Sequence, residues 1–151
     1  HPRHFITSGY QGNLGYGYAT ALGVKAAHPD KKVISISGDC GFMYQAQELA
    51  TAVKYGLDVV AIVFNNNSYG NVQNDLELMF EGQSIGAELH NPDFVKFAES
   101  FGAAGFKASN PNELRSAIQS AFVVSGPTLI EMTVGKMPRP WPYINLPKCR
   151  G

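Results

Sequence analysis

The sequence has few of the features that mark secreted, membrane-spanning or nucleic-acid-binding chains. Only two cysteines, Cys40 and Cys149, occur in 151 residues, which is too few for a disulfide framework and predicts a cytoplasmic location. The longest apolar run, residues 59–64, is far shorter than a membrane-spanning helix, and the first residues show no signal-peptide pattern. Twelve basic and twelve acidic residues give no net charge, so we expect neither a nucleic-acid nor a membrane partner.

Two further kinds of site lack their sequence signals. The four histidines are scattered and form no pair at metal-ligand spacing, which disfavours zinc. The glycines of residues 9–17 follow the spacing GxxGxG instead of the GxGxxG of dinucleotide-binding domains, and no suitably placed acidic residue follows a second strand. The spacing therefore does not favour a nucleotide-binding dehydrogenase domain, an alternative that NAD binding without metal would support.

Hydrophobic residues make up 44% of the chain and charged residues 16%, a balance typical of one globular domain with a sizeable core. Short runs rich in Val and Ile alternate with stretches of helical periodicity. We predict strands at residues 5–8, 32–37, 58–64, 104–107 and 128–134. We predict helices at residues 14–27, 44–55, 70–80, 91–101 and 110–124. Asn110 as N-cap, Pro111 and Glu113 open the last of these helices.

Strands that alternate with helices indicate an α/β fold with a mostly parallel, doubly wound sheet. Helices should cover both faces of this sheet and give three layers, α/β/α. We assign residues 1–135 to the domain and residues 136–151, which hold four prolines, to an extended tail. Because the first residue is not Met, we expect the chain to be a piece of a longer polypeptide.

Polar loops follow two of the predicted strands. Residues 38–41 come directly after the strand at 32–37, and residues 65–68 directly after the strand at 58–64. In an open parallel sheet, ligands bind beyond the carboxyl ends of the strands. Neighbouring strands lie roughly 5 Å apart, so Asp39 and Asn66 could reach one ion if these two strands are adjacent.

The residue types in these loops favour a hard cation and an anion. Asp39 and Asn66 offer oxygen ligands of the kind that Mg²⁺ or Ca²⁺ takes, and Mg²⁺ shares its coordination shell with phosphate and water. Gly38 and Gly41 allow backbone N–H groups to approach an anion closely, and the following helix adds a positive N-terminus. Together these residues predict a diphosphate held through a divalent cation. Taken alone, Asp39 fits better as an ordinary turn residue after a strand.

The triplet Gly38-Asp39-Cys40, followed one strand later by Asn65-Asn66, resembles the Gly-Asp-Gly and Asn-Asn signature of thiamine-diphosphate enzymes. Flanking segments at residues 7–17, 47–51, 91–102 and 126–131 are similar to the acetolactate synthase group within that family. The resemblance covers about residues 3–134. It implies the diphosphate-binding domain of the family, with the corresponding α/β fold.

The resemblance also assigns ligands to the cation. It implies a Mg²⁺ site to which Asp39 supplies a carboxylate oxygen, Asn66 an amide oxygen and Ser68 its backbone carbonyl. The N–H groups of residues 39–41 would hold phosphate oxygens. The third signature position is Cys40 instead of Gly, which would cost about 1–3 kcal/mol if a positive φ were needed there, although Gly41 could absorb the turn instead.

A second set of residues is implied for the other end of thiamine diphosphate. The backbone carbonyl of Gly12 would accept a hydrogen bond from the amino group of the cofactor. Leu14 would support the cofactor in its bent shape, although a Leu at the start of a helix is equally consistent with core packing.

The resemblance implies a decarboxylase or carboligase that acts on a 2-oxo acid, with the cofactor supplying the carbanion chemistry. The activating Glu of the family lies on a pyrimidine-side domain, which this chain lacks, so we expect no catalytic residue here and little turnover by the chain alone. That domain, on the same or a separate subunit, is the expected partner, within a homo-oligomer, and FAD is a possible cofactor only of the parent enzyme. The alternative is a non-catalytic assembly or binding module that retains the fold. Two features favour it, namely Cys40 at the third signature position and the missing domain.

Overall fold

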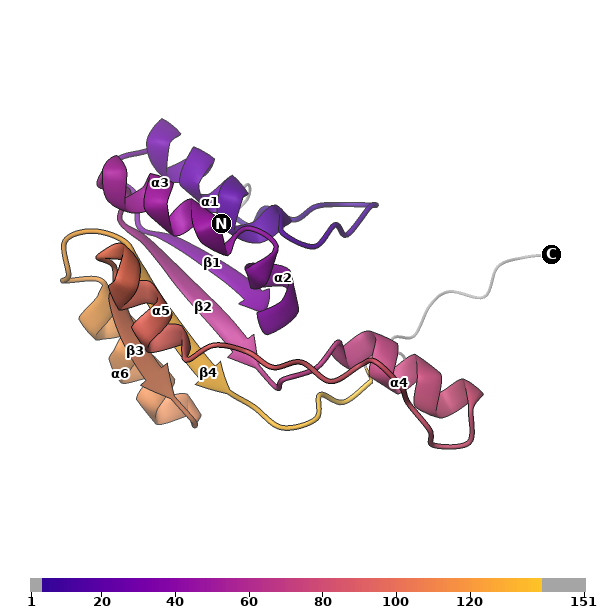
Figure 1. The fold of residues 1–151 in the computed structure, drawn as a ribbon. Coiled ribbons are helices and arrows are strands. Elements are labelled where there is room, and N and C mark those ends of the chain that lie inside the picture. Colours follow the sequence, from indigo (N-terminus) through magenta and orange to yellow (C-terminus); the bar gives the residue numbers. More distant parts are fainter. Residues whose placement is uncertain (1–3, 140–151) are drawn as a thin grey trace.

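Four parallel strands form the centre of the computed structural model, which describes residues 4–139 (Figure 1). The strands are β1 (Val33–Gly38), β2 (Val59–Asn65), β3 (Ala104–Ala108) and β4 (Thr128–Thr133). They lie in the order β1-β2-β4-β3, and each neighbouring pair is parallel. The predicted parallel α/β sheet is confirmed, and β1 and β2 are neighbours, which meets the condition for Asp39 and Asn66 to reach one ion.

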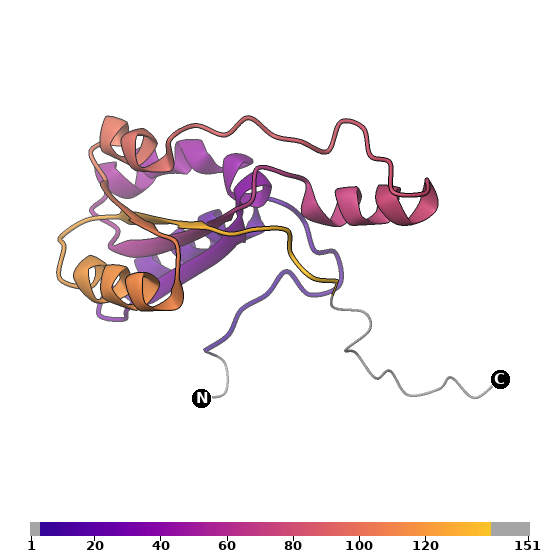
Figure 2. The ribbon, with the colours of Figure 1, turned by 90° about the horizontal axis from the view of Figure 1, so that it is seen from below.

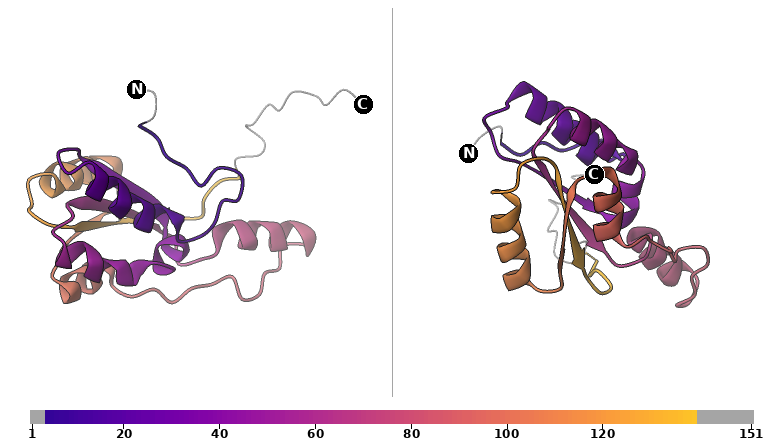
Figure 3. Two further views of the ribbon diagram at one scale, coloured as in Figure 1. Left: turned by 90° about the horizontal axis from the view of Figure 1, so that it is seen from above. Right: turned by 60° about the vertical axis from the view of Figure 1, so that its left-hand side comes forward.

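Helices cover both faces of the sheet, as predicted. One face carries α1 (Tyr16–Ala27), α2 (Asp39–Met43), the 3-10 helix η1 (Ala46–Glu48), α3 (Leu49–Lys54) and α5 (Phe94–Phe101). The other face carries α6 (Pro111–Ala121), and the right-hand view of Figure 3 shows α5 and α6 on opposite sides of β3. The strand β2 is almost wholly buried, because it contributes apolar side chains to the core on both faces.

The core on the α1 face contains a row of aromatic rings beneath the carboxyl ends of the strands. Phe42 of α2 packs edge-on against Tyr18 of α1, with ring centroids 5.4 Å apart, and against Phe94 of α5, at 6.0 Å. All three side chains are buried. This row fixes the short helix α2 and therefore the residue at its start, Asp39.

A long excursion, residues 66–93, leaves the sheet after β2 and returns before α5. We call it the arm. It contains α4 (Gly70–Met79), which lies beyond the carboxyl ends of the strands in Figure 1, and Figure 2 shows the chain running back from α4 toward α5. At the base of the arm Ser68 pairs with Glu88 in an isolated antiparallel bridge. The segments that leave and re-enter the sheet therefore lie side by side.

Two sequence predictions are wrong in part or in full, and a third can be compared with the structure only in part. Residues 5–8 form no strand, because no described strand pairs with them, and Phe5 is 85% exposed. The single helix predicted at residues 44–55 is instead α2, which begins earlier, followed by η1 and α3, since the backbone turns at Gln45. In the predicted tail, residues 136–139 run against α4 through an ion pair between Lys136 and Glu77, and the remaining residues lie outside the described part.

Candidate cation and diphosphate site

Asp39 lies at the carboxyl end of β1, directly opposite the end of β2. The register pairs Gly38 with Phe64, so Asp39 and Asn65 are the next residues across. Asp39 is only 2% exposed. Its Oδ1 accepts a hydrogen bond from the backbone N–H of Cys40 at 2.9 Å, and its Oδ2 accepts one from Nδ2 of Asn91 at 2.7 Å. The carboxylate is therefore buried and held by short hydrogen bonds, which an ordinary exposed turn residue does not require.

Asn65 joins the ends of three strands through a buried hydrogen-bond network. Its Nδ2 donates to Oε1 of Glu131 on β4 at 2.8 Å. Its Oδ1 accepts from Nδ2 of Asn91 at 2.9 Å and from the backbone N–H of Asn67 at 3.1 Å. Glu131 is 4% exposed and pairs with Lys107 of β3 at 3.4 Å. The polar groups at this edge of the sheet are thus linked from β3 to β1.

The backbone carbonyl of Ser68 lies at the base of the arm, outside the hydrogen bonds that pair its two segments. The N–H of Tyr69 donates to the carbonyl of Ala87, and the N–H of Leu89 donates to the carbonyl of Asn67, both at 2.8 Å. Ser68 therefore occupies a non-hydrogen-bonded position of the antiparallel pair, and its own carbonyl points away from the returning chain. This oxygen therefore accepts no hydrogen bond from the returning chain.

Asn66 is half-buried between the end of β2 and the start of α4. A Cβ at Gly70 would lie 3.2 Å from Nδ2 of Asn66, so the absence of a side chain at Gly70 leaves room for the amide. Asn66 takes no part in the hydrogen bonds that join Asn65, Asn67 and Asn91. Its amide oxygen is therefore not committed to that network.

The turn between β1 and α2 has no backbone strain at the unusual cysteine. Gly38 is the N-cap of α2, with extended backbone, and α2 begins at Asp39. Among the described residues only Asn67 and Glu81 are non-glycines with positive φ, so Cys40 carries none of the strain cost that a positive φ would bring. Burial, and secondarily the nearby Asp39 carboxylate, raise the pKa of the Cys40 thiol.

The predicted cofactor-facing loop lies next to this turn. A Cβ built on Gly41 would lie 3.7 Å from Cδ2 of Leu14, so Leu14 extends over the α2 turn. Leu14 is 54% exposed, which argues against the core-packing alternative. Gly12 is exposed with a φ of +60°, and no heavy atom lies within 4 Å of a Cβ built there. The structure thus brings Leu14 to the turn and leaves Gly12 in an open loop.

Sequence reasoning missed two residues of this edge. The sequence predicts Asn91 at the start of a helix and within a flanking segment similar to the family, whereas its side chain contacts Asp39, 52 residues earlier in the chain. Glu131 had been noted only as part of a flanking segment. An acidic residue inside an otherwise apolar strand was the available signal for Glu131, since buried charges are normally paired.

The donor set fits a small hard cation. A buried carboxylate, an uncommitted amide oxygen and an outward-pointing backbone carbonyl are all oxygen ligands, which Mg²⁺ prefers. Within residues 4–139 no group of three or more His, Cys, Asp or Glu side chains could hold a metal, so a site made only of those residue types is absent there. In the same range no helix is long and apolar enough to cross a membrane.

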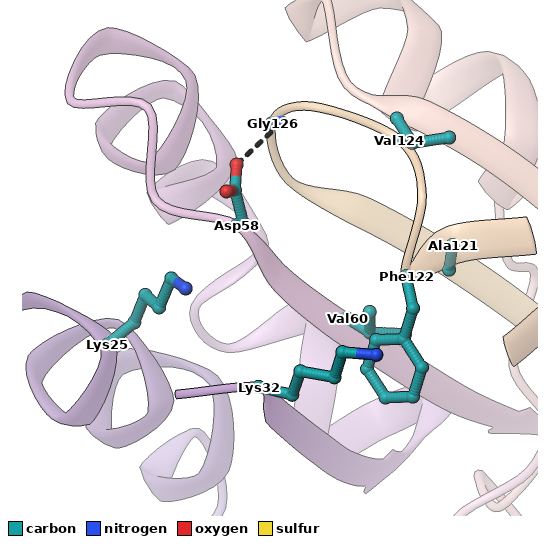
Figure 4. Close-up of a pocket in the computed structure, with 8 residues that line it drawn as sticks. All are labelled: Lys25, Lys32, Asp58, Val60, Ala121, Phe122, Val124 and Gly126. Carbon is teal, nitrogen blue, oxygen red and sulfur yellow. Dashed lines mark hydrogen bonds between the residues drawn. The ribbon is translucent and has the colours of Figure 1, made fainter. Parts of the chain in front are cut away.

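One cavity lies at the opposite, amino-terminal edge of the sheet (Figure 4). The charged side chains that line it make contacts within the protein. Lys32 lies over the ring of Phe122, with Nζ 4.4 Å from the ring centroid, and Asp58 accepts a hydrogen bond from the N–H of Gly126. The Lys25 ammonium donates to two backbone carbonyls. This cavity offers no uncommitted charge to a ligand.

Comparison with known proteins gives consistent matches. The family model described as thiamine pyrophosphate enzyme, C-terminal TPP binding domain, matches residues 1–132. The acetolactate synthase large subunit of Haemophilus influenzae is 43% identical over 124 residues, which cover 82% of this chain and 22% of the relative. The mitochondrial acetolactate synthase catalytic subunit of Saccharomyces cerevisiae is 36% identical over 135 residues, which cover 89% of this chain and 20% of the relative.

A solved structure is similar in both fold and sequence. The thiamine diphosphate-dependent 4-hydroxybenzoylformate decarboxylase of Rhodococcus jostii RHA1 superposes with a TM-score of 0.76 at 32% identity, covering 83% of this chain and 24% of that protein. The chain thus spans about a fifth to a quarter of the length of these relatives. It belongs to the thiamine pyrophosphate enzyme family, as a C-terminal TPP-binding domain of that family.

Proposed function

We propose that this chain binds thiamine diphosphate through a Mg²⁺ ion held by Asp39, Asn66 and the Ser68 carbonyl. In this proposal the chain is the diphosphate-binding part of a 2-oxo acid decarboxylase or carboligase that resembles acetolactate synthase. The N–H groups of residues 39–41 would face phosphate oxygens. Leu14 and the carbonyl of Gly12 would face the thiamine end of the cofactor.

The observation that carries the proposal is the convergence of two loops on one buried carboxylate. The pairing of β1 with β2 sets Asp39 opposite Asn65, and Asn91 joins the two through hydrogen bonds of 2.7 and 2.9 Å. The two amino-acid segments that the family signature singles out therefore meet at the carboxyl edge of the sheet, where ligands of open α/β sheets bind.

In the reaction this chain would bind and orient the cofactor. When bound, the cofactor supplies the carbanion chemistry. The buried Asp39 would hold the cation, and Leu14 lies against the same turn, so both ends of the cofactor would be held by residues of one domain. Orientation of this kind lowers the barrier without any proton transfer by the chain itself.

The names of the relatives support a 2-oxo acid substrate. One relative is named for the decarboxylation of 4-hydroxybenzoylformate, which is a 2-oxo acid, and others are named acetolactate synthases. The pyrimidine-side domain, a homo-oligomeric assembly and FAD in the parent enzyme stay predictions. A cytoplasmic location also stays a prediction, and two fungal relatives carry the label mitochondrial.

Titration calorimetry tests the proposal. The wild-type chain should bind thiamine diphosphate in excess Mg²⁺ and lose that binding when a chelator removes the metal. Asp39→Ala should abolish the metal-dependent part, because it removes the one carboxylate among the three proposed ligands. The control is Asp30→Ala, which removes an exposed carboxylate just before β1, at the opposite edge of the sheet, and should bind like the wild type.

Equal binding with and without the chelator would contradict the proposal. Saturable NAD binding without metal would instead favour a dehydrogenase domain. Absence of any binding at millimolar cofactor would favour the non-catalytic module. The backbone at Cys40 is unstrained, so the cysteine at this position no longer supports that alternative. The chain alone should show little or no turnover of pyruvate, since the expected activating Glu belongs to another domain.

A further inference from the structure

A carboxylate lies buried within β4, at a position that the proposed ligand set does not use. Glu131 is 4% exposed, and its neighbours Ile130 and Met132 are buried as well. A charge in such surroundings is costly unless it is paired and hydrogen-bonded. Oε1 of Glu131 accepts a hydrogen bond from Nδ2 of Asn65 at 2.8 Å, and Oε2 lies 3.4 Å from Nζ of Lys107. The charge is thus balanced by Lys107, while the hydrogen bond is directed at the end of β2.

The hydrogen bond between Asn65 and Glu131 fixes which way the Asn65 amide faces. An ionised carboxylate only accepts hydrogen bonds, so the NH₂ group of Asn65 points toward Glu131 and its Oδ1 points away. That oxygen accepts the backbone N–H of Asn67 at 3.1 Å and Nδ2 of Asn91 at 2.9 Å. The reversed amide would set an acceptor against Glu131 and a donor against the N–H of Asn67. Only the orientation that Glu131 selects therefore satisfies all of these groups.

The Asn65 side chain in turn holds the loop that carries two of the three proposed ligands. Its hydrogen bond with the N–H of Asn67 spans Asn66 and closes a turn of the kind that asparagine forms with the backbone two residues ahead. Asn67 needs such support, because its φ of +53° lies in the left-handed region, which is uncommon for a residue other than glycine. Ser68 follows directly. The positions of the Asn66 amide and the Ser68 carbonyl therefore depend on a side chain that Glu131 orients.

We propose that Glu131 is a positioning residue that, through Asn65, holds residues 65–68 in the conformation that binds the cation. Glu131 acts through Asn65 and is not itself assigned as a ligand. The role in cation binding rests on the proposed function, whereas the ordering of the loop by Glu131 can be measured without any ligand.

The first test measures hydrogen exchange of the backbone N–H of Asn67 by NMR, in the ligand-free chain labelled with ¹⁵N-asparagine. Glu131→Met removes the acceptor and keeps the length of the side chain, so the Asn65 amide is no longer held. The exchange at Asn67 should become about fivefold faster, the equivalent of one typical net hydrogen bond. The N–H of Asn112 is the internal control, because it donates to Oδ1 of Asn110 at the same distance, 3.1 Å, at the start of α6. Its exchange should not change.

The second test measures the Mg²⁺ concentration that half-saturates thiamine diphosphate binding, by titration calorimetry. Loss of a group that orients metal ligands typically weakens metal binding at least about tenfold, so Glu131→Met should raise this concentration by that factor. In an Asn65→Ala background the same substitution should add almost nothing, because its effect passes through Asn65. A merely structural role would instead give independent losses that add.

Two further variants separate positioning from stability. Glu131→Gln keeps an acceptor oxygen without the charge, so the exchange at Asn67 should rise only about twofold and lie between the wild type and Glu131→Met. This variant tests the proposal even if Glu131→Met does not fold. Leu129→Val shortens a fully buried side chain two residues earlier, on the same face of β4. It should leave both the exchange at Asn67 and the Mg²⁺ requirement unchanged.

The outcomes separate this inference from the proposed function. Unchanged exchange at Asn67 in every Glu131 variant that folds would overturn the positioning role, whatever the chain binds. Losses of Mg²⁺ affinity that add in the double variant would overturn it as well. A wild-type chain that does not bind thiamine diphosphate with Mg²⁺ would overturn the proposed function, and with it the role of Glu131 in cation binding.

Discussion

Cys40 stands beside the carboxylate of Asp39, yet it lies in an ordinary helical turn. Its thiol is partly buried, and both burial and the neighbouring negative charge disfavour the thiolate. Because the thiolate is the reactive form, this cysteine should be a poor nucleophile at neutral pH. The departure from the family signature at this position therefore adds no reactive group to the site.

Alkylation with iodoacetamide tests this reading in a Cys149→Ser background, which leaves Cys40 as the single cysteine. The pKa of Cys40 is raised from its ordinary value of 9.0, so the rate should rise with pH to a midpoint above 9. A midpoint below 9 would show that a positive environment stabilises the thiolate and would contradict the structure.

The short helix α2 depends on a single aromatic side chain for its position. Phe42 is 1% exposed and lies between the rings of Tyr18 and Phe94. Five residues cannot form a stable helix alone, so packing must supply its stability. The placement of Asp39 at the start of α2 is thus a consequence of the core beneath it.

Phe42→Ala should lower the free energy of unfolding by about 3–5 kcal/mol, because it leaves a cavity among buried rings. Urea denaturation followed by circular dichroism measures the loss. Phe80→Ala, which removes a 57% exposed ring after α4, is the matched control and should change stability little. Similar losses in both variants would contradict the assigned core.

The helix α5 begins with a titratable N-cap. The carboxylate of Asp93 accepts the N–H of Lys96, and this hydrogen bond is the main cause that lowers its pKa below the ordinary value of 3.8. A carboxyl group whose pKa is lower in the folded state stabilises the fold above its unfolded pKa. That contribution disappears as the pH falls through the folded pKa.

Asp93→Asn keeps a capping side chain without a charge that titrates. Its stability should therefore decline less than that of the wild type between pH 5 and pH 2, a window that contains the ordinary Asp pKa of about 3.9 and extends below it. Denaturation curves across this window provide the measurement. An identical acid dependence in both proteins would mean that the cap does not form.

At the scale of the whole molecule, apolar side chains remain uncovered. Ile34 and Ile36 on the edge strand β1 are 41% and 65% exposed, and Leu78 and Met79 on α4 are each 68% exposed. The left-hand view of Figure 3 shows α4 standing out from the sheet. Exposed apolar surface on an edge strand and on a protruding helix favours association with another chain.

We therefore expect the chain to self-associate in solution. Sedimentation equilibrium should give an average mass that rises with concentration, and Ile36→Lys should reduce the rise, because a charge on an edge strand disfavours pairing. A wild-type chain that remains monomeric at high concentration would contradict this expectation.

The sequence predicted all four strands of the sheet but only part of the site. Apolar runs revealed β1, β2 and β4, because buried parallel strands leave that pattern. The strand expected at residues 5–8 was wrong, since a strand exists only where a partner pairs with it, and periodicity contains no information about partners. The contact of Asn91 with Asp39 was missed for the same reason, because it depends on how the arm closes and not on local spacing.

The most direct measurement is a crystal structure of the chain with thiamine diphosphate and Mn²⁺, which replaces Mg²⁺ and is located by its anomalous scattering. We predict one ion within about 2.0–2.3 Å of a carboxylate oxygen of Asp39, the amide oxygen of Asn66 and the carbonyl of Ser68, bridging to the diphosphate. An ion bound elsewhere, or a diphosphate held without metal contact to Asp39, would contradict it.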